Sequence, residues 1–261
     1  DSVVTTYRDH GHMIARGLDP KNIMAELTGR STGYSKGKGG SMHMFSKQNN
    51  FYGGHGIVGA QVPIGTGIAF TLKYQNKKNI SRIYIGDGAM NNGQVFESFN
   101  LASLWKLPAL YIIENNMYGM GTSVSRAAAG SDLYKRGESF GIPGEIVDGM
   151  NIFKVRDAAF KAGKHVRDGK GPFILEVQTY RYRGHSMSDP AKYRTKEELE
   201  SYKTQDPIQI AKEEILKKKI VSEKFLDKIN KDTIEKVKEA ANYALSAPFP
   251  EDKELYTNVY I

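Results

Sequence analysis

The sequence predicts an α/β fold: a mostly parallel sheet with helices on both faces, followed by a helical region at the C-terminal end. Two observations support this prediction. Short β-prone runs alternate with helical patterns between residues 79 and 116, and again between residues 157 and 177. Beyond residue 193 the apolar residues instead recur at roughly helical intervals as far as Ala247. Strands separated by helices return parallel, and their sheet needs cover on both faces.

A glycine-rich stretch from Gly29 to Gly67 precedes this alternation. We expect residues 59–74 to form a helix despite Gly65 and Gly67, with another element packed closely against it.

The first strand–helix–strand unit lies between residues 79 and 116. Residues 82–85 are a short β-prone run that ends in a glycine, and residues 94–105 carry apolar side chains on one helical face. Residues 109–113 have the composition of a buried strand. This order predicts a βαβ unit.

A second alternation follows. Asp157 is the expected N-cap of a helix, residues 169–172 form a turn, and residues 173–177 form a strand. A polar loop then spans residues 180–193. Because the sequence shows no repeat, low-complexity tract or flexible linker, we expect one α/β domain over residues 1–190, with residues 191–261 as a helical extension packed on it.

The composition is that of a globular protein, with 39% hydrophobic and 25% charged residues among 261. No apolar run approaches the length of a membrane span, so we expect no membrane association. The absence of cysteine excludes disulfides and thiolate metal sites, and it favours a reducing, intracellular compartment. The net charge of +8 lies largely on C-terminal segments that mix lysines with acidic residues. A solvated helix face explains this charge better than nucleic-acid binding does.

The chain begins at Asp1, without a methionine, and runs directly into the apolar pair Val3-Val4. This beginning is typical of the middle of a fold and of neither a signal peptide nor a transit peptide. We expect the sequence to be an N-terminally truncated fragment.

Polar side chains follow two strands of the predicted βαβ unit at the points where these strands end. Asp87, between Gly86 and Gly88, comes directly after the first strand, and Asn116 follows the second. One crossover helix fits between them, so parallel strands bring both side chains to the same sheet edge. A carboxylate and an amide oxygen suit Mg²⁺, which usually also takes oxygens from phosphate and water. The sequence therefore predicts a site for magnesium and a phosphorylated ligand.

Other interpretations of the individual motifs are weaker. Gly-Asp-Gly alone usually forms a turn, and paired asparagines usually cap an element, but the combination on a βαβ frame is specific. Residues 33–40 lack the hydroxyl residue that a P-loop requires after its lysine, and residues 53–59 follow no clear strand. The histidines at positions 10, 12, 43 and 55 show no metal-ligand spacing with a supporting carboxylate, so zinc is not expected.

Longer segments extend these motifs into a resemblance that covers essentially the whole chain. The segments are residues 37–44, 52–61, 86–93, 114–122 and 180–190. With them the chain resembles the thiamine diphosphate-dependent 2-oxo acid dehydrogenases, and within that family the alpha subunits of the heterotetrameric pyruvate dehydrogenase decarboxylating component.

The resemblance implies specific roles for individual residues. Asp87, the Asn116 side chain and the Tyr118 carbonyl would bind Mg²⁺, and His185 would contact the diphosphate and help handle substrate as a catalytic residue. The full set of implied cofactor-binding residues is Tyr7, Arg8, Gly56, Val58, Asp87, Gly88, Ala89, Asn116, Tyr118 and His185. An arginine fork at position 8 suits phosphate oxygens.

The resemblance also implies partners. In that family a beta subunit supplies the glutamate that activates the cofactor, the assembly is an α₂β₂ heterotetramer, and a lipoyl-bearing dihydrolipoamide acetyltransferase accepts the acetyl group formed from pyruvate. We therefore expect a bacterial cytoplasmic enzyme subunit, with the mitochondrial matrix as the alternative location. Acetoin or branched-chain 2-oxo acid dehydrogenase subunits are the alternatives for substrate. A non-catalytic basic scaffold protein is the alternative of another class.

Overall fold

The computed structural model describes residues 1–257 and residue 259. The chain divides into two compact units, which are described separately below. The first unit comprises residues 1–4 and 57–222, and the second comprises residues 5–56 and 223–261. Residues 191–222 thus group with the sheet, whereas residues 223–261 group with residues 5–56. The expected boundary at residue 190, with one packed extension beyond it, stays a prediction.

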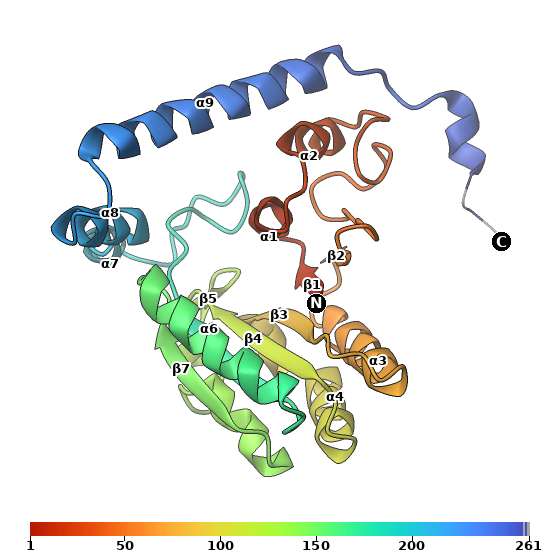
Figure 1. The fold of residues 1–261 in the computed structure, drawn as a ribbon, viewed down its shortest axis with the longest axis vertical. Coiled ribbons are helices and arrows are strands. Elements are labelled where there is room, and N and C mark those ends of the chain that lie inside the picture. Colours follow the sequence, from red (N-terminus) through yellow and green to blue (C-terminus); the bar gives the residue numbers. More distant parts are fainter. Residues whose placement is uncertain (258, 260–261) are drawn as a thin grey trace. The chain divides into compact units, whose positions relative to one another are not determined.

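A parallel sheet forms the centre of the first unit (Figure 1). In spatial order its strands are β1 (Ser2–Thr6), β3 (Ser81–Gly86), β4 (Ala109–Asn115), β8 (Phe173–Gln178) and β7 (Gly144–Asp148). Each neighbouring pair in this series is parallel. The predicted α/β fold with a mostly parallel sheet is therefore confirmed.

Helices cover both faces of this sheet. On one face α3 (Gln61–Tyr74) and α4 (Gly93–Leu104) share a buried core with side chains such as Ile83 and Tyr111. On the other face α6 (Ile152–Arg167) packs against side chains such as Ile112. Successive residues of a strand point to opposite faces, so one apolar strand serves both cores.

The glycines of α3 have different roles. A Cβ on Gly65 would lie 2.4 Å from Ile83 Cγ1, and the Gly65 carbonyl accepts a hydrogen bond from Ser81 Oγ at 2.8 Å. The expected close packing against this helix is therefore present at Gly65. Gly67 has no atom within 4 Å of the place where its Cβ would lie.

The predicted start of α6 is wrong. The N-cap is Asn151, whose Oδ1 accepts hydrogen bonds from the backbone N–H groups of Phe153 and Lys154. Asp157 lies inside the helix. Both residue types favour N-caps, and the local pattern did not separate them.

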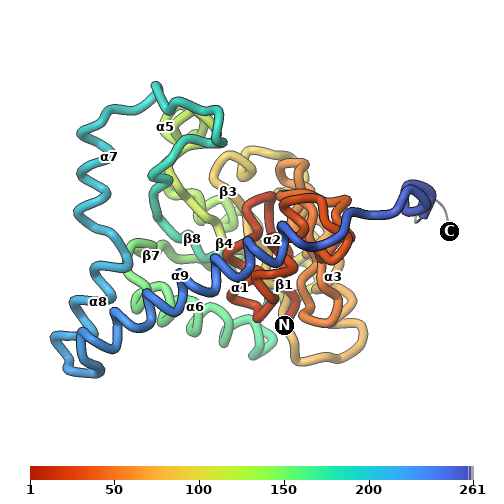
Figure 2. The backbone as a smooth tube through the Cα atoms, turned by 90° about the horizontal axis from the view of Figure 1, so that it is seen from above, coloured from red at the N-terminus to blue at the C-terminus, as the bar shows by residue number. Residues whose placement is uncertain are grey.

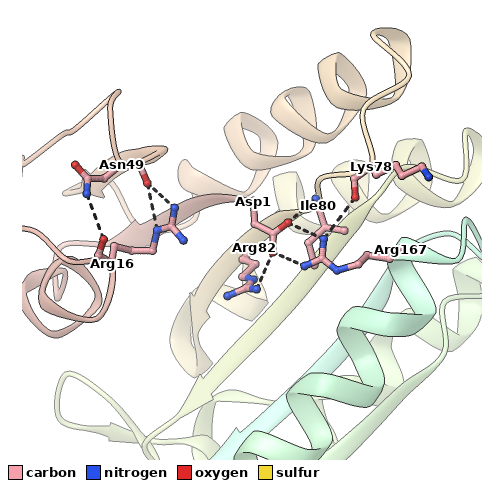
Figure 3. A network of polar contacts seen from close by, with 7 residues as sticks. All are labelled: Asp1, Arg16, Asn49, Lys78, Ile80, Arg82 and Arg167. Atoms are coloured by element: carbon pink, nitrogen blue, oxygen red, sulfur yellow. Dashed lines mark hydrogen bonds and ion pairs between the residues drawn. The ribbon is translucent and has the colours of Figure 1, made fainter.

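Asp1 forms a network of polar contacts with residues next to β1, in β3 and at the end of α6 (Figure 3). Its carboxylate accepts hydrogen bonds from Arg82 Nη2 at 2.7 Å, Arg167 Nη1 at 2.8 Å and the Ile80 backbone N–H at 3.2 Å. These contacts join β1 to β3 and to the end of α6. Such a charge-assisted network fixes strand positions more firmly than an isolated surface ion pair would.

Short elements complete the first unit. The 3₁₀ helix η1 directly follows β3, and a small antiparallel pair of strands follows β4. The bounds are η1 (Asp87–Asn91), β5 (Tyr118–Gly119), β6 (Thr122–Ser123), α5 (Val124–Ala127), η2 (Leu133–Phe140), α7 (Lys196–Lys203) and α8 (Pro207–Lys217).

The second unit is built around helices. Its elements are α1 (His10–Ala15), α2 (Pro20–Leu27), β2 (Phe51–His55), α9 (Glu223–Ser246) and η3 (Asp252–Tyr256). The long α9 lies beside α2 (Figures 1 and 2). Thr5 and Thr6 at the end of β1 also belong to this unit, and β2 is the neighbour of β1 in the strand order. Arg16 donates to the Asn49 carbonyl at 2.6 Å, as Figure 3 shows.

Buried Glu26 organises the glycine-rich stretch of the second unit. Its carboxylate accepts four backbone N–H groups, from Ser35, Gly37, Gly39 and Gly40, at 2.7 to 3.2 Å. This arrangement gives the four backbone donors a common acceptor.

Among residues 1–257 and 259, no helix has both the length and the apolar character that crossing a membrane requires.

Candidate functional site

The candidate site begins at the carboxyl edge of β3 and β4. The two strands are parallel, with Gly86 at the end of β3 opposite Glu114 near the end of β4. Asp87 follows β3 and is only 4% exposed. Asn116 follows β4, and its Oδ1 atom is buried with no hydrogen-bond partner among the described residues. The parallel pairing brings the carboxylate and the amide to neighbouring strand ends, as predicted.

The loop after β4 folds back against η1. A Cβ on Gly88 would lie 3.3 Å from the Gly119 Cα, and a Cβ on Gly119 would lie 3.9 Å from Asp87 Oδ2. Residues 116–122, called here the metal loop because Asn116 and Tyr118 are the predicted metal ligands, thus pass beside Asp87. Glycine at both points of closest approach leaves the backbone accessible.

The two asparagines at the end of β4 have different environments. Asn115 is buried, and its Nδ2 donates to Glu176 Oε1 at 2.7 Å while its Oδ1 accepts the Met117 N–H at 3.1 Å. Glu176 also accepts the Tyr134 N–H at 3.0 Å. Asn115 therefore shapes the turn, and Asn116 alone presents an unpaired oxygen.

Sequence reasoning missed Glu176. Its signal was a charged residue within the otherwise apolar run of residues 173–177. A buried carboxylate in a strand needs donors, and here they are the Asn115 side chain at the end of β4 and the Tyr134 backbone N–H in η2.

Arg181 contacts the metal loop from the segment after β8. It donates to the Tyr118 carbonyl at 3.1 Å, to the Met120 carbonyl at 2.5 Å and to Tyr193 Oη at 2.7 Å. A carbonyl oxygen has two lone pairs, so the bond from Arg181 leaves one of them on Tyr118 for a metal ion.

His185 lies in the loop that Asp189 closes. Asp189 accepts the His185 N–H at 2.6 Å, the Ala191 N–H at 2.8 Å and Tyr193 Oη at 2.8 Å. The backbone bond from His185, followed by those from Ala191 and Tyr193, lowers the pKa of Asp189 to about 2. Hydrogen bonds therefore connect the Tyr118 carbonyl, through Arg181, Tyr193 and Asp189, to the backbone of His185.

The other predicted residues of the first unit lie near the same strand end or on the segment that precedes α3. Ala89 is buried in η1. Val58 is 48% exposed, and its carbonyl accepts hydrogen bonds from Asn92 and Gln94. An exposed apolar side chain is available for contact with a ligand ring.

The predicted residues Tyr7, Arg8 and Gly56 belong to the second unit. Arg8 is exposed and donates to Tyr7 Oη at 3.3 Å. A Cβ on Gly56 would lie 3.1 Å from the His43 ring. The assignment of these three residues to one site with Asp87 stays a prediction.

Asp9, next to Arg8, is a buried carboxyl group that no sequence signal indicated. Its side chain is 0% exposed and lies 3.5 Å from His10 Nε2. Burial raises the pKa of Asp9 to about 6, and the neighbouring His10 only partly opposes this shift. A buried carboxyl group with a raised pKa thus directly follows the predicted phosphate-binding arginine in the sequence.

A metal ion at this site would need a mixed set of ligands. The described residues contain no group of three or more His, Cys, Asp or Glu side chains that could hold one. The predicted ligands are instead the Asp87 carboxylate after β3, the Asn116 amide oxygen after β4 and the Tyr118 backbone carbonyl in β5. Such hard oxygen donors suit Mg²⁺ that also binds phosphate oxygens.

Comparison with known proteins gives a consistent family. The model of the family described as "Dehydrogenase E1 component" matches residues 1–253. The chain is 57% identical to the pyruvate dehydrogenase E1 component subunit alpha of Rickettsia felis, over 100% of this chain and 80% of that protein. It is 57% identical to the protein of the same name from Rhizobium meliloti, over 100% of this chain and 75% of that protein. It is 52% identical to the mitochondrial pyruvate dehydrogenase E1 component subunit alpha of Dictyostelium discoideum, over 100% of this chain and 69% of that protein.

Proposed function

Because the chain belongs to the Dehydrogenase E1 component family, we propose that it is the alpha subunit of a pyruvate dehydrogenase (acetyl-transferring). In this proposal it holds Mg²⁺ and the diphosphate of thiamine diphosphate for the oxidative decarboxylation of pyruvate and the reductive acetylation of a lipoyl group. The names of the relatives support pyruvate as the substrate.

The observation that supports the metal site best is the unpaired Oδ1 of Asn116 beside buried Asp87. An unsatisfied buried acceptor costs about 1–3 kcal/mol. A Mg²⁺ ion bound by the Asp87 carboxylate, the Asn116 amide and the Tyr118 carbonyl would satisfy it. Mg²⁺ takes about six oxygens, so diphosphate and water would complete its coordination.

Several residues of this chain would bind the diphosphate itself. Gly88 and Ala89 lie in η1 directly after Asp87 and would face the anion with backbone N–H groups. Tyr7 and Arg8 would bind phosphate oxygens, and an exposed arginine fork suits this role. Gly56 and Val58 would lie against the cofactor rings.

When bound, thiamine diphosphate supplies the carbon nucleophile and the electron sink that decarboxylation of a 2-oxo acid requires. The role of this chain is to hold the charged end and to present His185 to diphosphate and substrate. The glutamate that activates the reactive end would come from a beta subunit in an α₂β₂ assembly. A lipoyl-bearing dihydrolipoamide acetyltransferase would accept the acetyl group.

The proposed location is the bacterial cytoplasm, with the mitochondrial matrix as the alternative, since the relatives include bacterial proteins and one named as mitochondrial. An acetoin or branched-chain 2-oxo acid dehydrogenase subunit is the alternative for substrate. The two are distinguished by kcat/KM for pyruvate, acetoin and branched 2-oxo acids in the assembly with the beta subunit.

Calorimetry tests the cofactor site. We expect thiamine diphosphate to bind the chain with its beta subunit only when Mg²⁺ is present, and Asp87→Ala to abolish this binding. Asp227→Ala, an exposed position on α9, is the matched control and should bind like the wild type. Tight binding by Asp87→Ala would refute the site. Salt-sensitive DNA binding with no cofactor effect would instead favour a basic scaffold protein.

The isolated chain provides a second test. Without the beta subunit it should show no decarboxylation of pyruvate, because the proposed activating group lies on the other chain. Turnover by the isolated chain at a rate comparable to that of the assembly would contradict the proposal.

A further inference from the structure

Two tyrosine hydroxyls meet at one carboxylate on α7. Tyr118 Oη donates to Glu198 Oε1 at 2.9 Å and to Oε2 at 3.0 Å. Tyr180 Oη donates to Glu198 Oε1 at 2.8 Å. Tyr118 belongs to the metal loop and Tyr180 to the segment after β8, so Glu198 joins three separate parts of the first unit.

The position of Glu198 is itself well defined. It lies in the first turn of α7, where its N–H donates to the N-cap Thr195 Oγ1. The ring of Tyr180 is buried and stacks on Tyr202 of the same helix, with 3.9 Å between ring centroids and 6° between planes. A carboxylate at a helix N-terminus is also favoured by the helix dipole. The carboxylate therefore lies on a regular helix rather than on a mobile loop.

Glu198 contacts the metal loop, whose backbone has an unusual conformation at two residues. Met117 has φ of 72° and Met120 has φ of 54°, both in the left-handed region that non-glycine residues rarely adopt. The residue between them that bears the proposed metal-binding carbonyl, Tyr118, is fixed at its side-chain end by Glu198 and at its carbonyl by Arg181. Tyr118 is therefore held at two points, its hydroxyl and its carbonyl, by groups that lie outside the loop.

We propose that Glu198 is a positioning residue for the metal loop, which orients the Tyr118 carbonyl toward the Mg²⁺ site through the tyrosine hydroxyl. This inference rests on the proposed function, because that function supplies the metal. Groups that hold a metal ligand from outside the coordination sphere change metal affinity by about 10–100-fold when they are removed.

The test compares two glutamates in the first turn of one helix. Glu198→Gln keeps the shape of the side chain but removes its charge and one acceptor, whereas Glu197→Gln changes an exposed neighbour with the same relation to the helix dipole. In the assembly with the beta subunit, the apparent Kd of Mg²⁺ is measured by calorimetry at saturating thiamine diphosphate. We expect Glu198→Gln to raise it about 10-fold and Glu197→Gln to leave it unchanged.

A second readout separates positioning from general stability. Metal binding raises the melting temperature in proportion to the logarithm of metal concentration over Kd. For Glu198→Gln the Mg²⁺-dependent rise should shrink, whatever happens to the melting temperature without metal. Tyr118→Phe, which removes only the hydroxyl, should weaken Mg²⁺ in the same direction and keeps the test available if Glu198→Gln does not fold.

The outcomes have distinct meanings. If the wild type shows no Mg²⁺-dependent cofactor binding, the proposed function fails. If the wild type binds while Glu198→Gln and Tyr118→Phe retain wild-type Mg²⁺ affinity, the positioning role of Glu198 is refuted and the proposed function stands. Equal weakening by Glu197→Gln would also refute the role, because the effect would then come from helix charge.

Discussion

Replacement of Glu26 tests how the glycine-rich stretch of the second unit is held. Glu26 is 0% exposed, and its carboxylate accepts four backbone N–H groups from residues 35–40. Glu26→Ala would leave all four donors without this acceptor, and Glu26→Gln would keep one accepting oxygen while turning an NH₂ group toward two of the donors.

The magnitude follows from the number of orphaned donors. An unsatisfied buried N–H costs about 1–3 kcal/mol, so four independent donors would cost about 4–12 kcal/mol. Bonds within one network are not additive, and water entering the space left by the side chain would restore part of the loss. We therefore expect the low end of this range, about 4 kcal/mol, for Glu26→Ala and about 2 kcal/mol for Glu26→Gln.

The assay is urea unfolding, combined with amide hydrogen exchange at residues 35–40. Glu239→Gln is the matched control: Glu239 lies on α9 of the same unit, and its side chain is 63% exposed, 3.6 Å from Lys21. Exposed ion pairs contribute about 0–1 kcal/mol, so the control should be nearly neutral. A loss below about 1 kcal/mol for Glu26→Ala, with unchanged exchange at residues 35–40, would refute the reasoning.

Two further predictions concern packing and pH. Gly65→Ala should destabilise the chain by about 1–3 kcal/mol, because the new Cβ would lie 2.4 Å from Ile83 Cγ1, whereas Gly67→Ala on the same helix has open space and should be neutral or stabilising in thermal unfolding. Burial raises the pKa of Asp9 in the folded chain from its ordinary value of 3.8 to about 6, so its stabilising contribution is present below pH 4 and is lost as pH rises through 6. Asp9→Asn should remove this loss, which is on the order of 3 kcal/mol in the free energy of unfolding. The measurement is urea unfolding of the wild type and the variant from pH 4 to 8. If the variant showed the same pH profile as the wild type, the burial argument would be contradicted.

The parts of the fold that were predicted from sequence are those with strong local patterns. Residues 109–113 are continuously apolar because the strand is buried on both faces, and β4 occupies Ala109–Asn115. β7 was missed because Gly144–Asp148 is partly exposed and carries charged residues, so no apolar run marks it. The grouping of residues 223–261 with residues 5–56 depends on contacts between distant segments, which periodicity does not encode.

The candidate site also contains residues that a local pattern indicates and residues that only contacts between distant segments reveal. The position of Asp87 and Asn116 at neighbouring strand ends could be predicted because parallel topology alone brings these ends together, and their role as ligands stays a prediction. Arg181 and Glu198 were missed because each contacts the metal loop from a segment distant in sequence, and Glu176 was missed because it contacts Asn115 from another strand. Arg181 and Glu198 lie in polar segments, where such residues are usually solvated surface residues, so only their partners in space distinguish them.

The adjacent asparagines show how far a motif can be interpreted. Asn115 has its amide committed to Glu176 and Met117, whereas Asn116 keeps a buried oxygen that nothing in the described part of the chain satisfies. A pair that served only to cap a turn would have both side chains bonded to the backbone. The unequal use of the two amides favours one structural residue beside one ligand-binding residue. Since an unsatisfied buried acceptor destabilises the free chain, binding of a cation at Asn116 should stabilise the fold as well as supply the proposed cofactor site.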